Sequence, residues 1–172
     1  MQAINRSSNS TNSSMDFSID IKSLSLTKKI TIGFSIALLI LALTQPAFYI
    51  DREDHDAWAN SFLLFTFGWS FILGGSTESL IWWANPLYIT AIFFLVKNRK
   101  ISIIFSLSAL ALASSFMFLN EIMTSESGQM SRITELKLGY KMWVLSFAVL
   151  LIGTLVDLLF DKTRNNSRTT IS

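Results

Sequence analysis

Long apolar runs constrain this chain more than any other feature of its sequence. Residues 30–50, 80–96, 101–119 and 142–160 form runs of 17 to 21 residues, each with at most one charged side chain. An α-helix rises about 1.5 Å per residue, so helices of this length cross a hydrocarbon core about 30 Å thick. The whole chain is 51% hydrophobic and 15% charged, which departs from the composition of soluble domains. We therefore predict an all-α integral membrane protein, a four-helix bundle whose spans are these four runs.

A fifth apolar run, within residues 58–75, is shorter and allows two interpretations. It is either another span or an interfacial or re-entrant helix on the outer side. If it crosses, the 14 Lys and Arg divide evenly, seven to each side; if it does not, ten lie on the side of the termini. Because cytoplasmic loops are enriched in Lys and Arg, we predict four spans in a bacterial inner (cytoplasmic) membrane with both termini cytoplasmic. The ten are Arg6, Lys22, Lys28, Lys29, Lys97, Arg99, Lys100, Lys162, Arg164 and Arg168.

The tryptophans agree with four spans, because amphipathic aromatic rings prefer the headgroup level. In this arrangement all five lie on the outer side, and we predict four of them as interface anchors: Trp58, Trp69, Trp83 and Trp143. The link Lys-Asn-Arg-Lys at 97–100 is short enough to make spans two and three an antiparallel hairpin. Outside the membrane domain, 28–163, we expect a disordered cytoplasmic arm at 1–27 and a polar tail at 164–172. The segment 120–141 is expected to be an outer loop able to fold over the bundle.

Four residues at the outer start of span two form the best candidate for an intramembrane polar or ligand site. Glu78, Trp82 and Asn85 are spaced four and three apart, so they share one helix face, and Pro86 cannot donate to the carbonyl of Trp82. A small polar ligand fits this pattern. So does a structural role, in which Glu78 complements the helix dipole, Trp82 anchors the interface and Asn85 bonds to another helix.

Span three and span four each carry a further pattern. Small residues at spacings of four, three and four predict a helix-packing face on span three, where a neighbouring backbone approaches closely. These residues are Ser102, Ser106, Ala109 and Ala113. In span four, Asp157 lies near the inner end, where we expect it to reach the headgroup zone or Lys162.

Composition excludes several kinds of chemistry. With no Cys the chain has no disulfide, thiolate ligand or thiol nucleophile, and a single histidine, His55, makes an imidazole metal site improbable. Motifs for acyl transfer, zinc hydrolysis and phosphate binding are absent from the sequence. We therefore predict no catalytic residues, no cofactor and no metal, and a net charge of only +2 gives no reason to expect nucleic acid.

The runs Trp-Trp-Ala-Asn-Pro-Leu at 82–87 and Leu-Gly-Tyr-Lys-Met-Trp at 138–143, with the basic turn between them, carry a resemblance. In the order of these parts, from about residue 68 to 159, the chain resembles a group of small four-span bacterial inner-membrane proteins of unassigned function. It departs from their pattern in having Glu78 and two adjacent tryptophans at the start of span two. The resemblance implies a membrane location and brings no activity, cofactor or ligand.

These observations favour a non-enzymatic accessory, partner-binding or immunity-type protein that acts through helix contacts. The alternative is a subunit of a transporter or channel with a polar site near Asn85 and Glu78. A membrane enzyme using Glu78 and Glu121 is a third hypothesis. The partners we expect are the lipid bilayer and another membrane protein or a second copy of the chain.

Overall fold

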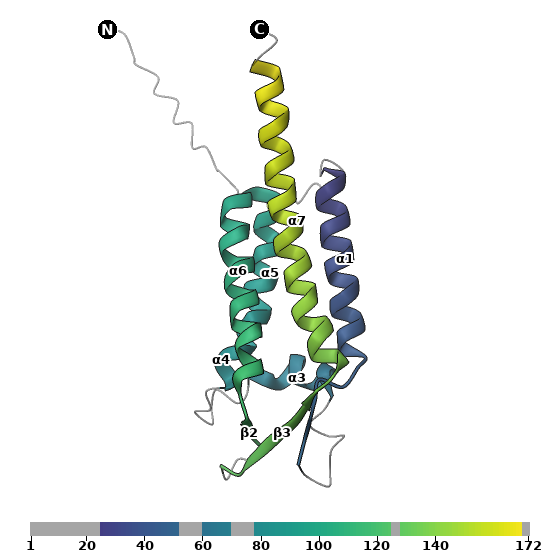
Figure 1. Ribbon diagram of the computed structural model, residues 1–172, viewed down its shortest axis with the longest axis vertical. Coiled ribbons are helices and arrows are strands. Elements are labelled where there is room, and N and C mark those ends of the chain that lie inside the picture. The colour runs from purple at the N-terminus through teal and green to yellow at the C-terminus, as the bar shows by residue number, and fades with distance from the viewer. Residues whose placement is uncertain (1–24, 52–59, 70–77, 125–127, 170–172) are drawn as a thin grey trace, which may run out of the picture.

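The computed structural model describes residues 25–51, 60–69, 78–124 and 128–169. Within these residues, four helical segments are long and apolar enough to cross a membrane: Leu26–Leu43, Ser79–Lys97, Arg99–Phe118 and Leu138–Asp161. They run alternately up and down beside one another, and a small sheet lies at one end (Figure 1). The chain is thus a multi-pass membrane protein built on a mostly helical, antiparallel four-helix bundle.

The first span is shifted relative to the prediction. Helix α1 (Leu26–Leu43) is capped by Ser25, whose hydroxyl accepts from the backbone N–H of Lys28. It ends before Pro46, because proline lacks an N–H and disfavours helix in the residue before it. The prediction of a helix through residue 50 was therefore wrong, and residues 25–27 belong to the bundle rather than to an arm. The rest of the predicted arm, 1–24, lies outside the described residues.

The second span is interrupted where Pro86 removes a hydrogen bond. Helix α4 (Glu78–Trp82) and helix α5 (Ala84–Lys97) are separated by Trp83, whose N–H turns back to the carbonyl of Leu80 at 3.1 Å. Since the proline ring would clash with the carbonyl of Trp82, four residues earlier, the break falls where the sequence requires it.

Helix α5 and helix α6 (Arg99–Ser115) form the predicted hairpin, with Asn98 as the single residue between them. The Asn98 side chain caps α6 by accepting from the backbone N–H groups of Lys100 and Ile101. A 3₁₀ turn, η3 (Phe116–Phe118), ends α6. Helix α7 (Leu138–Thr169) extends past the other helices (Figure 1), so residues 164–169, expected as a polar tail, are helical.

The core of the bundle combines one large aromatic pair with small residues. Tyr88 of α5 stacks on Phe147 of α7 with ring centroids 4.6 Å apart. All four residues of the predicted packing face of α6 are buried, and the Ser102 hydroxyl donates to the carbonyl of Ala91 across the α5–α6 contact at 2.7 Å. The small side chains let these helices approach closely.

A three-stranded antiparallel sheet caps the end of the bundle where α1 stops. Its order is β1 (Phe48–Ile50), β3 (Met130–Leu136) and β2 (Glu121–Met123). The sheet is a small addition to the predicted helical bundle, and it replaces the loop expected at 120–141 with two strands. It forms because its inner face buries a second apolar cluster, separate from the bundle core. That cluster is built from Ala47, Phe48, Ile50 and Ile122, with Leu64, Phe116, Ile133 and Leu136 packed against it.

A short helix, α3 (Ser61–Phe67), lies inside the predicted interfacial segment 58–75. Seven residues span only about 10 Å, too little to cross a membrane. Helix α1 ends, and α4 begins, at the end of the bundle that carries the sheet (Figure 1). The chain between them therefore returns to the side it left, while a position of α3 at the lipid interface stays a prediction.

Candidate functional site

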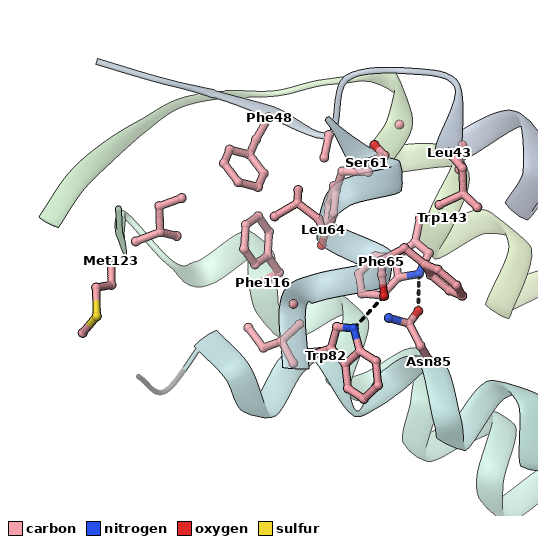
Figure 2. Close-up of a pocket in the computed structure, with 17 residues that line it drawn as sticks. Leu43, Phe48, Ser61, Leu64, Phe65, Trp82, Asn85, Phe116, Met123 and Trp143 are labelled. Atoms are coloured by element: carbon pink, nitrogen blue, oxygen red, sulfur yellow. Dashed lines mark hydrogen bonds between the residues drawn. The ribbon is translucent and has the colours of Figure 1, made fainter. Parts of the chain in front are cut away.

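The capped end of the bundle contains an apolar pocket of about 140 Å³ (Figure 2). Its walls come from α1, β1, α3, α4, α5, η3, β2 and α7, so segments from almost the whole described chain meet there. The lining is aliphatic and aromatic apart from Ser61, Asn85 and the polar tips of aromatic rings. Such a site selects an apolar occupant and uses its few polar groups to orient it.

Asn85 is the central polar residue of this pocket. Only 5% of its surface is exposed, and its Oδ1 accepts from the indole Nε1 of Trp143 at 2.9 Å. Because an indole N–H can only donate, the oxygen must face Trp143 and the amide nitrogen Nδ2 must face away. Figure 2 shows Nδ2 pointing into the pocket, and no residue in the described part of the chain accepts from it.

Trp82 of α4 is hydrogen-bonded to α3 at the wall of the pocket. Its Nε1 donates to the carbonyl of Phe65 at 2.9 Å (Figure 2). A Cβ on Gly68 would lie 2.5 Å from Cδ1 of the indole, so the residue facing Trp82 has to be glycine. Trp82 therefore links α3 and α4 within the capped end of the bundle, whereas the sequence suggested that it anchors the protein at the membrane interface.

Of the four predicted site residues, the structure brings Trp82 and Asn85 to one pocket. Pro86 is half-buried in the first turn of α5, and its carbonyl accepts from the Thr90 hydroxyl at 2.7 Å. Glu78 begins α4, and its side chain lies outside the described residues. Of the predicted constellation, the structure therefore places an indole and an amide at the pocket.

The predicted interface anchors occupy different surroundings. Trp83 and Trp69 are about half exposed, at 49% and 47%, and Trp69 donates to the carbonyl of Thr66. Trp143 is directed inward to Asn85. Trp58 lies outside the described residues, and contact of these rings with lipid headgroups stays a prediction.

A second polar centre lies in the middle of the bundle, and the sequence analysis missed it. The Ser35 hydroxyl of α1 lies 2.7 Å from the carbonyl of Ser146 on α7 and 2.6 Å from the Tyr88 hydroxyl on α5. The serine has one proton, which goes to the carbonyl, so Tyr88 donates to Ser35. All three residues are at most 2% exposed. The sequence signal that could have identified this centre is a tyrosine within an apolar span.

A third polar centre closes the end opposite the sheet. Arg99 pairs with Asp157, Nε to Oδ2 at 2.7 Å, and with Asp161, Nη1 to Oδ2 at 2.5 Å. The Asp157 contact is an ion pair without hydrogen-bond geometry, while its Oδ1 accepts from the hydroxyl of Ser25 at 3.0 Å. Asp157 is only 5% exposed and joins α1, α6 and α7. Its position at the headgroup zone stays a prediction, and the side chain of Lys162 lies outside the described residues. The sequence signals that could have identified this cluster are the spacing of four between Asp157 and Asp161 and the basic turn at 97–100.

The pocket offers one free hydrogen-bond donor among apolar groups, and the described residues hold no group of three His, Cys, Asp or Glu side chains able to bind a metal. No family model matches the chain, and no curated protein or solved structure is significantly similar to it.

Proposed function

We propose that this protein is a non-enzymatic accessory protein of the bacterial inner membrane that works by binding at its capped outer end. Its occupant is a small, largely apolar molecule or group with one hydrogen-bond acceptor. The observation that carries the proposal is the amide nitrogen of Asn85, which faces an apolar pocket and has no hydrogen-bond acceptor shown among the described residues. An occupant with a suitably placed oxygen would gain a hydrogen bond to this donor in apolar surroundings.

The size of the pocket limits the occupant. A dry apolar cavity of about 150 Å³ is known to accept benzene, and this pocket, at about 140 Å³, is similar in size. The part of the occupant held inside therefore has about six non-hydrogen atoms. A small ring or a short acyl segment with a carbonyl or ether oxygen meets both conditions.

The interior of the bundle favours binding over transport. Beneath Asn85 the space is filled by the stacked rings of Tyr88 and Phe147, and by Leu150, all at most 2% exposed. A transporter or channel subunit needs a polar path along its spans. Within the described bundle, the polar groups below Asn85 are hydrogen-bonded to one another, as in the contacts of Ser35 with Tyr88 and Ser146, and are enclosed by packed side chains. This packing supports an end-on binding site.

Two probes of equal shape test the binding proposal. Cyclopentanone carries an acceptor oxygen, and methylenecyclopentane replaces that oxygen with a CH₂ group. In detergent micelles, we expect cyclopentanone to raise the thermal unfolding midpoint of the protein more than methylenecyclopentane does. The difference should vanish in Asn85→Leu and persist in Thr90→Val, a control that removes a half-buried hydroxyl on the same helix. Equal stabilisation by both probes, or a difference that survives in Asn85→Leu, would contradict the proposal.

Cysteine labelling tests the proposed orientation, because the chain has no cysteine of its own. Lys100→Cys lies in the turn that we place in the cytoplasm, and Thr134→Cys lies on an exposed position of β3 that we place outside. In intact cells, a membrane-impermeant maleimide should label Thr134→Cys alone. Labelling of Lys100→Cys alone would reverse the orientation.

A further inference from the structure

The end of the bundle opposite the sheet carries an open groove lined by six residues of α1 and the α5–α6 turn: Lys28, Val96, Lys97, Asn98, Arg99 and Lys100. Its volume is about 560 Å³, and four of the six residues are cationic. The turn lies where two spans end, which is the depth of lipid headgroups. The groove therefore presents positive charge where phosphate groups are concentrated.

Lys28 is the residue that distinguishes this groove from a solvated basic turn. Only 8% of its surface is exposed, although it lines the groove. Among the described residues its ammonium has neither a hydrogen bond nor an ion pair, because the nearby carboxylates of Asp157 and Asp161 are paired with Arg99. A buried cation is unfavourable unless an anion neutralises it. The carboxylates of Asp157 and Asp161 also attract Lys28, but the four cations that line the groove outnumber these two carboxylates, so the groove keeps an excess of positive charge.

We propose that this groove binds a phosphate group, supplied by the headgroup of an anionic phospholipid or by free inorganic phosphate. Lys28 makes the innermost contact, and Lys97 and Lys100 approach the phosphate from the rim. Three spans, α1, α5 and α6, flank the groove, and basic pockets between membrane helices are suited to phospholipid headgroups. The groove and the apolar pocket lie at opposite ends of the bundle, so this proposal is independent of the proposed function.

Native mass spectrometry of the full chain in neutral detergent tests the proposal. With phosphatidylglycerol we expect one lipid per protein to bind saturably, and with phosphatidylcholine much weaker binding. Lys28→Gln should weaken phosphatidylglycerol binding about fivefold, the effect of one basic residue at a membrane surface. Lys29→Gln is the matched control: it removes the same charge from the next position, which is exposed and outside the groove, and should change binding less than twofold.

Competition separates the two sources of phosphate. If millimolar inorganic phosphate displaces the lipid, the site takes free phosphate; if it does not, the lipid headgroup is the ligand. Equal losses in Lys28→Gln and Lys29→Gln, or equal binding of both lipids, would overturn the proposal. Should Lys28→Gln fail to fold, Lys100→Gln on the exposed rim replaces it, and undiminished binding in that variant would overturn the proposal as well.

Discussion

The hydrogen bond from the Tyr88 hydroxyl to the Ser35 hydroxyl predicts that removing its donor and removing its acceptor lower the stability by different amounts. Tyr88→Phe removes one oxygen and leaves Ser35 donating to the carbonyl of Ser146. The variant loses one hydrogen bond and strands no donor, so we expect it to lower the free energy of unfolding by about 0.5–1.5 kcal/mol. Hydrogen bonds between membrane helices average about 0.6 kcal/mol, which favours the lower half of that range.

Ser35→Ala also removes one oxygen, but its consequence is larger. The Tyr88 hydroxyl, on a residue only 2% exposed, then loses its acceptor at 2.6 Å and keeps only the neighbouring Ser146 hydroxyl as a partner. Leaving a buried donor poorly paired costs up to about 1–3 kcal/mol. We expect Ser35→Ala to destabilise the protein by about 1 kcal/mol more than Tyr88→Phe does. In the double variant no donor is stranded, so the combined loss should fall short of the sum of the single losses by about 1 kcal/mol.

Reversible unfolding in mixed detergent micelles measures these differences. The matched control is Ser106→Ala, which removes a buried hydroxyl that donates within its own helix, to the carbonyl of Ile103 at 3.1 Å. We expect it to change stability by less than about 0.5 kcal/mol, because it strands no partner. If Ser35→Ala is no worse than Tyr88→Phe, or if the two losses add within about 0.3–0.5 kcal/mol, the hydrogen-bond direction argued here is wrong.

Two further predictions concern helix contact and charge, and the same unfolding assay measures both. Gly153→Ala should destabilise the bundle by about 1–3 kcal/mol, because the new Cβ would overlap Thr31 of α1; Gly33→Ala meets no atom within 4 Å and should be neutral or slightly stabilising. A neutral Gly153→Ala would mean that α1 and α7 do not approach as closely as the structure has them. Asp157→Asn should cost about 2–3 kcal/mol, since it breaks a largely buried ion pair, whereas Asp161→Asn, with 46% of its side chain exposed, should cost less than about 1 kcal/mol. Equal losses of stability in Asp157→Asn and Asp161→Asn would show that burial does not determine how much each ion pair with Arg99 stabilises the protein.

Local patterns were sufficient to predict the helices and part of the site. Apolar runs identify the spans because a membrane requires about 20 apolar residues in one helix. The break at Trp83 follows from Pro86, and the small residues of α6 pack inward as their spacing indicated. Asn85 was recognisable as an internal contact because an amide in lipid must find a partner.

The features that the sequence analysis missed depend on contacts between distant segments. β1 and β3 pair Ile50 with Ile133 across the chain, and β1, with three residues, carries too short an alternation to be recognised. Likewise, the pairing of Arg99 with Asp157 depends on how two helices are rotated about their axes, which a pattern along one helix cannot specify. The pocket itself is a product of this tertiary arrangement, since its walls come from segments far apart in the chain.

The two ends of the bundle are connected through α7. This helix contributes Trp143 to the pocket, Ser146 to the central hydrogen bonds and Asp157 to the charged cluster, over about 20 Å of its length. A shift of α7 by one residue would rotate its side chains by about 100° and break all three contacts together. The register of α7 therefore determines both the orientation of Asn85 in the pocket and the pairing of Asp157 with Arg99 beside Lys28.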